Sequence, residues 1–226
     1  MDLSCIIPVY NNEKTVRELA ETLNEILNEK YQFEIIFVND CSKDRSLMEI
    51  NSLAEDYKFV SCVNLSSNGG QNNALLHGFR HARGEKVMVM DADLQDNLLM
   101  VPQMIENLTS DFDSLFILRK GMYQSYSRML TSFILKGCIQ LIVGLPRAAG
   151  TFFITQKHIV TKVINMKCSF PYITIMIFSS SEQVVYLSSK RKSNFGKSAY
   201  TFKKRLIHAG KALICAFQCR FLHSPK

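Results

Sequence analysis

The chain has 226 residues, 47% of them hydrophobic and 21% charged, which fits one globular domain with a sizeable core and excludes a low-complexity or repeat protein. Its net charge of +7 hides a basic second half, which predicts an anionic partner such as a phosphate-bearing substrate or a membrane surface; the plainer alternative is a soluble surface that happens to be basic. The basic residues are not interleaved with a nucleic-acid-binding motif, so we expect no nucleic acid to bind. The seven cysteines show no CxxC or metal-ligand spacing and are expected to be free thiols in a reducing cytoplasm.

The first half of the chain alternates between strand and helix patterns. After the first strand, Asn11 or Asn12 is expected to cap a helix, and Gly84 is expected to close the third helix as its C-cap. This alternation predicts a parallel sheet with helices on both faces. The expected strands are 3–9, 33–38, 59–65 and 86–90, and helices follow the first three of them.

The second half alternates less regularly. A long helix with basic and apolar residues is expected from about residue 200. The longest apolar run, 129–145, is interrupted by Lys136 and Gly137 and is shorter than the roughly 20 residues of a membrane span. We therefore expect a single domain, 1–226, with no spanning helix and no signal peptide. The remaining expected elements are strands at 114–118, 150–154 and 182–188 and helices at 125–143 and 156–166.

Polar loops follow the first four expected strands: PVYNNE, NDCSKD, SSNGGQ and DADLQD. Open parallel sheets bind ligands beyond the carboxyl ends of their strands, so these loops predict a site. The last loop places three carboxylates, Asp91, Asp93 and Asp96, close together. Such a cluster is repulsive unless a cation lies between the acids, and carboxylate oxygens suit Mg²⁺ or Mn²⁺. The plainer alternative is that Asp91 and Asp93 only cap the next helix.

The motifs IIPVYNNE, IIFVNDCSKD, LSSNGGQNNALLHGFRHARGE and VMDADLQD occur in the order and spacing of family 2 glycosyltransferases. The chain most resembles polyprenyl-phosphate sugar synthases and related bacterial envelope-polysaccharide transferases, and FGKSAYTFKKRL (195–206) resembles the segment that closes their catalytic domain. The resemblance implies a GT-A nucleotide-diphospho-sugar transferase fold, α/β with a mostly parallel central sheet flanked by helices. It also implies an inverting transfer from a UDP-, GDP- or dTDP-linked sugar.

The resemblance assigns roles to individual residues. Asp91, Asp93 and Gln95 would hold Mg²⁺ or Mn²⁺, which neutralises the departing diphosphate, and Asp93 would thereby be catalytic. Asp40 would accept a hydrogen bond from a base N–H. Asp91 would also contact the nucleotide, and the other residues expected to contact it are Pro8, Val9, Tyr10, Glu13, Gly70 and Gln71.

The sequence departs from the family pattern at several positions. Asn39 and Cys41 replace the usual Asp and Gly beside Asp40, and Ser67 replaces an arginine. The usual DLQDPPE reads DLQDNLLM, and the later strand reads AGTFFI, without the usual acid and arginine. Ser193 also stands where an arginine is usual. The nucleotide half, 1–113, is therefore well matched, and the acceptor half, 114–226, is altered.

The charge distribution bears on the acceptor. Residues 1–113 contain 9 Lys/Arg and 19 Asp/Glu, whereas residues 114–226 contain 18 Lys/Arg and a single acid, Glu182. A sugar hydroxyl generally needs a carboxylate base, whereas a lipid phosphate is already an anion. This favours a polyprenyl-phosphate acceptor, with Lys197 and Arg191 holding phosphates. The alternatives are a saccharide hydroxyl acceptor in capsule or O-antigen assembly, with Asp96 as the base, and a nucleotide-binding protein that has lost transfer activity.

The C-terminal segment suggests an association with lipid. Apolar residues of the helix expected from about residue 200 could face an anionic membrane surface while its lysines and arginines meet headgroups. The alternative is a final helix docked on the domain with a solvated basic face. We expect a cytoplasmic protein, peripheral on the cytoplasmic face of the membrane if the helix binds lipid.

Overall fold

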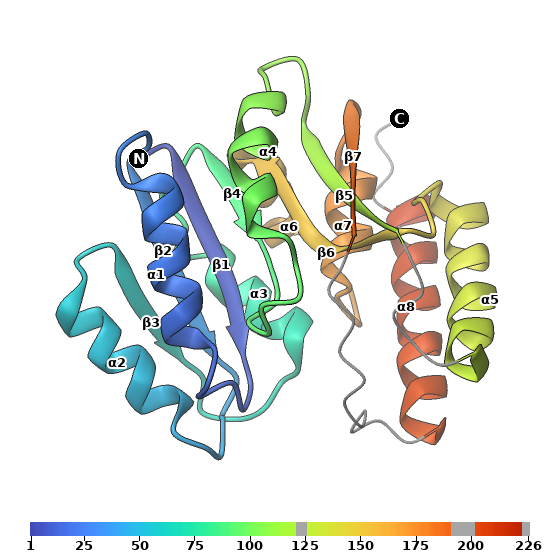
Figure 1. The fold of residues 1–226 in the computed structure, drawn as a ribbon. Coiled ribbons are helices and arrows are strands. Elements are labelled where there is room, and N and C mark those ends of the chain that lie inside the picture. Colours follow the sequence, from blue (N-terminus) through green and yellow to red (C-terminus); the bar gives the residue numbers. More distant parts are fainter. Residues whose placement is uncertain (121–125, 191–201, 223–226) are drawn as a thin grey trace.

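The computed structural model describes residues 1–120, 126–190 and 202–222, arranged around one seven-stranded sheet (Figure 1). The strand order is β3-β2-β1-β4-β6-β5-β7. The strands are β1 (Leu3–Val9), β2 (Phe33–Asn39), β3 (Val60–Asn64), β4 (Lys86–Val89), β5 (Ser114–Lys120), β6 (Ala149–Gln156) and β7 (Val184–Lys190).

The sheet is mostly parallel, as the sequence predicts. β1 pairs in parallel with β2 and β4, β2 with β3, and β5 with β7, whereas β6 runs antiparallel to both of its neighbours. The chain builds outward from β1 to β3 and then returns to place β4 on the other side of β1. This reversal is the topological switch point at which open α/β sheets bind their ligands.

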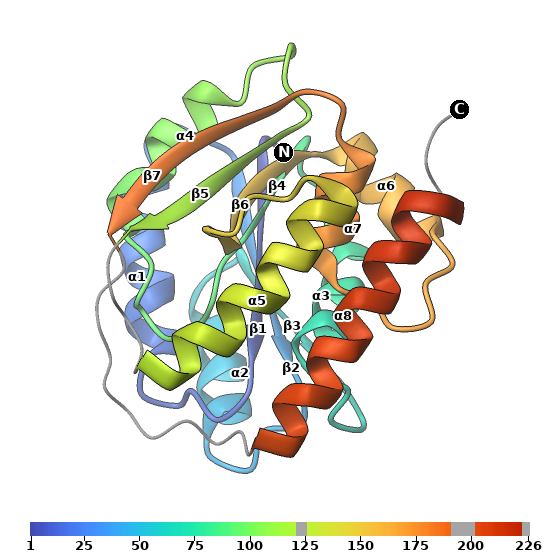
Figure 2. The same cartoon turned by 90° about the vertical axis from the view of Figure 1, so that its right-hand side faces the viewer.

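Helices cover both faces of the sheet (Figures 1 and 2). One face packs against α1, α2 and α4, and the other against α3, α6 and α7, with α5 and α8 beyond them. A short 3₁₀ turn, Leu98–Met100, precedes α4. The helices are α1 (Val16–Leu27), α2 (Ser46–Asp56), α3 (Gln71–Phe79), α4 (Val101–Asn107), α5 (Tyr126–Val143), α6 (Lys157–Asn165), α7 (Ile173–Ser180) and α8 (Phe202–Leu222).

The burial of β1 explains why the sequences of the central strands are almost continuously apolar. Cys5, Ile7 and Val9 point into the core under α1, whereas Ile6 points into the core under α3. All four are completely buried. A strand buried on both faces cannot alternate between apolar and polar residues, and each buried aliphatic side chain contributes about 1.5–3 kcal/mol.

Two sequence-based predictions about helix ends are wrong. The N-cap of α1 is Thr15, and Asn12 lies three residues before it, where its carbonyl oxygen accepts the Thr15 N–H. Helix α3 ends at Phe79 and is followed by Arg80 as its C-cap, so Gly84 does not close it. Gly84 is required for another reason: a Cβ there would lie 2.5 Å from the backbone nitrogen of Ser4 in β1.

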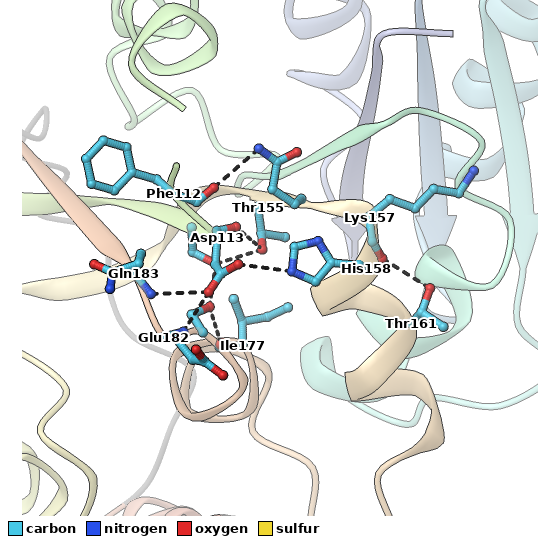
Figure 3. Close-up of polar contacts among 12 residues, drawn as sticks. Phe112, Asp113, Thr155, Lys157, His158, Thr161, Ile177, Glu182 and Gln183 are labelled. Atoms are coloured by element: carbon cyan, nitrogen blue, oxygen red, sulfur yellow. Dashed lines mark hydrogen bonds and ion pairs between the residues drawn. The ribbon is translucent and has the colours of Figure 1, made fainter. Parts of the chain in front are cut away.

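Asp113 fixes the amino-terminal end of β5 to the neighbouring elements (Figure 3). Its carboxylate accepts the backbone N–H groups of Glu182, at 2.7 Å, and Gln183, at 3.2 Å, just before β7. It also pairs with Nε2 of His158 in α6, at 3.0 Å. Glu182 therefore lies at the amino end of β7, the opposite end of the sheet from the loops that follow β1 to β4.

Among the described residues, no helix combines the length and the apolar character that crossing a membrane requires.

Candidate functional site

The loops that follow β1, β2, β3 and β4 meet at one edge of the sheet, as the sequence predicts. The Asn11 N–H donates to Ser42 Oγ at 3.1 Å, and the Arg45 N–H donates to the Glu13 carboxylate at 2.9 Å. The Thr15 hydroxyl donates to the carbonyl oxygen of Ala92 at 2.5 Å. These bonds join the first loop to the second and to the fourth.

Asp44 strengthens the junction between the first two loops. Burial opposes the charge on its carboxylate, but hydrogen bonds from the Ser46 hydroxyl and from the backbone N–H groups of Ser46 and Glu13 outweigh it and lower the pKa. The Asp44 carboxylate is therefore charged at neutral pH and holds both loops in place.

Three residues in these loops adopt the left-handed conformation, which is unfavourable for residues with a side chain. The φ angles are 57° at Asn11, 58° at Cys41 and 56° at Leu94. Each such residue costs roughly 1–2 kcal/mol, and strain of this kind gathers at functional sites. The angle at Cys41 also explains the family pattern, because glycine, the usual residue there, adopts this conformation without strain.

Asp40 shapes the loop after β3. It is 3% exposed, and its two carboxylate oxygens accept the N–H groups of Gly69, at 2.7 Å, and Gly70, at 2.9 Å. The Asn68 side chain donates to the Asp40 carbonyl oxygen at 3.0 Å. Gly70 has φ of 82° and is the N-cap of α3, so Asp40 sets where this helix begins. Contact between Asp40 and a nucleobase stays a prediction.

Asn39, which replaces the usual Asp, uses its amide group to form two hydrogen bonds. Asn39 is buried, and its Nδ2 donates to Oδ1 of Asn64 at 2.7 Å, linking the ends of β2 and β3. Its Oδ1 accepts the Ser42 N–H at 3.3 Å. An aspartate at position 39 has no N–H to donate to Asn64, so the amide pairs the two strand ends in a way that the usual acid cannot.

Three of the residues expected to bind the nucleotide lie where β1 passes into the first loop. Val9 is buried at the end of β1, Pro8 is partly buried, and Tyr10 is 45% exposed. The carboxylate of the fourth, Glu13, accepts the backbone N–H of Arg45 in the second loop. The structure thus gathers these four residues with Asp40, Gly70 and Gln71 at the same edge of the sheet.

Asp91 is the centre of a polar cluster directly after β4. Gln71 Nε2 donates to Asp91 Oδ1 at 2.6 Å, and the Thr151 hydroxyl donates to the same oxygen at 2.9 Å. Arg119 Nη2 lies 3.3 Å from Asp91 Oδ2 and 3.4 Å from Asp96 Oδ1. The side chains of Arg119 and Asp96 are 12% and 5% exposed, so these charges face each other away from solvent.

Arg119 is the functional candidate that the sequence reasoning missed. It follows the predicted strand 114–118 directly, at the carboxyl end of β5. A basic residue at the end of a predicted strand could have indicated a functional role. The sequence does not show, however, that Arg119 meets Asp91 and Asp96 after β4 and Thr151 in β6. The Arg119 N–H donates to the carbonyl oxygen of Ala148 at 3.0 Å, and the Arg119 side chain lies against Gly150 and donates to the Thr151 hydroxyl at 3.3 Å. A Cβ at Gly150 would lie 2.6 Å from the Arg119 guanidinium carbon. The lack of a side chain at Gly150 thus leaves room for this arginine.

The donor chemistry of the acidic cluster fits a divalent cation. Asp91 and Asp93 follow β4 two residues apart, and the Asp93 carboxylate accepts the Gln95 N–H at 3.1 Å. The guanidinium group between Asp91 and Asp96 shows directly that these acids face a positive charge. Within the described part of the chain, no group of three or more His, Cys, Asp or Glu side chains forms a ready metal cage. Ligands from a phosphate or water would therefore have to complete the coordination.

Two residues expected to hold phosphates, Lys197 and Arg191, lie outside the described residues. Asp96, expected as a base for a hydroxyl acceptor, is buried and paired with Arg119.

Comparison with known sequences finds a matching family and several relatives. The model of the glycosyl transferase family 2 matches residues 4–168. The putative glycosyltransferase CsbB of Bacillus subtilis is 33% identical over 167 residues, which are 73% of this chain and 51% of CsbB. The undecaprenyl-phosphate 4-deoxy-4-formamido-L-arabinose transferase of Pectobacterium carotovorum is 29% identical over 95% of this chain and 67% of its own length. The chain thus spans about half the length of CsbB and about two thirds of the arabinose transferase.

Solved structures confirm the predicted GT-A fold. Glucosyl-3-phosphoglycerate synthase of Mycobacterium tuberculosis, in complex with Mn²⁺, UDP and glucosyl-3-phosphoglycerate, superimposes with a TM-score of 0.68 at 12% identity, over 100% of this chain and 81% of that one. TarS of S. aureus in complex with UDP-GlcNAc gives 0.58 at 20% identity, over 99% and 74% of the two chains. At these identities the likeness shows the fold alone.

Proposed function

Because the chain belongs to glycosyl transferase family 2, we propose that it transfers a sugar, with inversion, from a nucleoside diphosphate sugar to a polyprenyl phosphate or another membrane-linked acceptor. The observation that carries this proposal is the polar cluster after β4. There Asp91 lies beside the switch point of the sheet, within reach of Gln71 from the third loop and Arg119 from β5. The cluster thus offers acidic side chains that could hold a metal ion and an arginine, Arg119, that could bind phosphate groups.

The first half of the chain is proposed to bind the nucleotide. The partly exposed Tyr10 and the loop 68–71, fixed by Asp40, border the same edge of the sheet. TarS of S. aureus, which shares the fold, has been solved in complex with UDP and with UDP-GlcNAc, which supports a nucleotide at this edge. Asp40 would act mainly by holding the loop 68–71 against the base.

Asp91, Asp93 and Gln95 are proposed to hold Mg²⁺ or Mn²⁺. When bound, the ion would offset the charge that develops on the departing diphosphate. The Mn²⁺ complex of glucosyl-3-phosphoglycerate synthase, which shares the fold, supports this choice of metal. Asp91 also bonds to Gln71, Thr151 and Arg119, so replacing it would disturb these contacts as well as remove a proposed ligand.

The position of the acids supports a phosphate acceptor. Attack by a sugar hydroxyl needs a base, whereas a lipid phosphate is already ionised. Asp96 is poorly placed to act as a base, because it is buried and its carboxylate faces Arg119 at 3.4 Å. Glu182, the single acid after residue 113, lies at the opposite end of the sheet. The name of the Pectobacterium relative, an undecaprenyl-phosphate transferase, agrees with this choice of acceptor.

The outer helices are proposed to bind an anionic membrane surface. Helix α8 buries one face, which carries Ala212, Cys215, Ala216 and Cys219. The opposite face exposes an apolar stripe, defined here as Ile207, Ile214, Phe217 and Phe221, which are 50%, 44%, 53% and 71% exposed. Figure 2 shows α5 beside α8, and Leu141 of α5 is 86% exposed.

Charge complements this apolar stripe. Lys211 and Arg220 are exposed on α8, and neither α5 nor α8 contains an acidic residue. A helix of this kind lies in the interface, with its apolar side chains among the acyl chains and its cations at anionic headgroups. A protein held this way would meet a lipid-linked acceptor at the membrane surface.

Vesicle flotation tests the membrane contact. The protein should float with vesicles of phosphatidylglycerol at low salt, and Phe217→Ser with Phe221→Ser should reduce the floating fraction severalfold. Met48→Ser, on α2, is the matched control because Met48 is also more than half exposed. Equal flotation of the double variant and the control would contradict the assignment of this surface.

Donor binding tests the enzymatic proposal. A thermal-shift screen of UDP-, GDP- and dTDP-sugars should find one that stabilises the protein, and more so with Mn²⁺. Asp93→Ala should abolish the Mn²⁺-dependent part of the shift, whereas Asp111→Ala, an exposed acid before β5, should leave it unchanged. If no nucleotide sugar shifts the melting temperature, with or without the metal, the proposal fails.

A further inference from the structure

The contacts of Arg119 show one positive charge that the acidic cluster faces. A single nitrogen, Nη2, reaches Asp91 Oδ2 at 3.3 Å, Asp96 Oδ1 at 3.4 Å and Thr151 Oγ1 at 3.3 Å. All three distances are at the long end for hydrogen bonds from nitrogen. None of these contacts has the short, two-pronged geometry in which an arginine binds a carboxylate most strongly. Charge attraction, more than hydrogen-bond geometry, keeps Arg119 at the acids.

The rest of the guanidinium group has unused capacity. Nε is buried and has no hydrogen-bond partner among residues 1–120, 126–190 and 202–222. A buried N–H without a partner is costly, and an arginine fork suits the paired oxygens of a phosphate. The group lies against Gly150, where any side chain would collide with it. Arg119 is therefore confined near the acids but is not saturated by them.

A divalent ion and Arg119 would compete for the same charge. Asp91 is both the carboxylate that Arg119 faces and one of the two acids proposed to hold the metal. A dication placed there would lie within a few ångströms of the guanidinium, and like charges repel strongly at such distances where water is scarce. The diphosphate of a donor removes the conflict, because it brings negative charge that both cations can share.

We propose that Arg119 is an internal counter-ion that keeps the acidic cluster from binding a divalent cation until a nucleoside diphosphate is present. Arg119 is then a positioning residue that makes metal binding depend on the nucleotide. This inference rests on the proposed function, because it takes Asp91 and Asp93 as the metal site.

Binding of Mn²⁺, followed by its electron paramagnetic resonance signal, tests this inference without any turnover. Without nucleotide, Arg119→Gln should bind Mn²⁺ at least tenfold more tightly than the unaltered protein. With saturating UDP the difference should disappear or reverse, because the variant lacks a cation for the diphosphate. Lys162→Gln, which removes one exposed positive charge from α6, is the matched control and should bind Mn²⁺ as the unaltered protein does.

A second variant covers the case in which Arg119→Gln does not fold. Gly150→Ala keeps the arginine but displaces its guanidinium from the acids, so it should also bind Mn²⁺ more tightly without nucleotide. Equal Mn²⁺ affinity in the unaltered protein and in either folded variant would overturn the inference. If that equality held while UDP and Mn²⁺ still bound together, the proposed function would stand. Failure of every form to bind Mn²⁺, with or without UDP, would overturn both.

Discussion

Replacing Asp40 with asparagine should destabilise the protein and loosen the loop that leads into α3. The carboxylate of Asp40 is 3% exposed and accepts two backbone N–H groups, from Gly69 at 2.7 Å and from Gly70 at 2.9 Å. An asparagine keeps one acceptor oxygen but turns its own N–H groups toward the other donor. One bond is lost, and two donors then face each other in a partly buried place.

The size of the effect follows from these contacts. A hydrogen bond to a charged group contributes about 1.5–3 kcal/mol, and a buried donor left without a partner costs about 1–3 kcal/mol. We therefore expect Asp40→Asn to lower the free energy of unfolding by about 2–4 kcal/mol. Asp56→Asn is the matched control, because Asp56 is 53% exposed and its ion pair with Arg17, at 3.4 Å, contributes at most about 1 kcal/mol.

Urea unfolding and amide hydrogen exchange measure both consequences. The midpoint should fall in Asp40→Asn with the slope unchanged, and the amide protons of Gly69 and Gly70 should exchange faster than in the control variant. A midpoint equal to that of Asp56→Asn, together with unchanged protection of the two glycine amides, would refute the role of Asp40 as the anchor of this loop.

Gly84→Ala should cost about 2–3 kcal/mol in urea unfolding, because its Cβ would lie 2.5 Å from a backbone nitrogen of β1; unchanged stability would contradict this close approach. At Asp113, burial raises the pKa but the backbone N–H bonds and His158 outweigh it, so the folded pKa lies below its ordinary value. The stabilisation by Asp113 is therefore present above that ordinary value, about 3.9, and is lost as the pH falls through the lowered folded pKa. Asp113→Asn should be less stable than the unaltered protein near pH 6, by about 1–3 kcal/mol, and the gap should narrow toward pH 2.5; a gap that did not change with pH would refute it.

The strands and the polar loops could be predicted because their signals are local. Strands buried on both faces, such as β1, are continuous apolar runs, and each ends where polar residues begin. The convergence of the loops then follows from parallel topology alone. The acidic cluster could be found in the same way, since Asp91 and Asp93 follow β4 directly.

Two helices could not be predicted from periodicity. Helix α7 is only eight residues long and carries apolar residues on every side, so its sequence, ITIMIFSS, gives no helical period. Helix α4 has seven residues and begins with Pro102 in its first turn. Both depend on burial against the sheet, which is not visible in a short stretch of sequence.

Arg119 was missed because its role depends on strand order. Its neighbours Gly150 and Thr151 lie on β6, which inserts antiparallel between β4 and β5. A register irregularity between Phe116 and Leu118 further shifts the pairing of the two strands. The absence of the usual acid and arginine from AGTFFI suggested a degraded acceptor half, whereas the structure brings an arginine to that place from the neighbouring strand.

Sugar transfer to a lipid phosphate tests the central claim most directly. The protein would be incubated with undecaprenyl phosphate in vesicles, Mn²⁺ and the nucleotide sugar that gives the largest thermal shift, and the lipid would be analysed by mass spectrometry. We predict an undecaprenyl-phosphate sugar, which Asp93→Ala does not form. A donor that binds together with the metal but yields no glycosylated lipid, and instead a glycosylated saccharide when one is supplied, would contradict the claim.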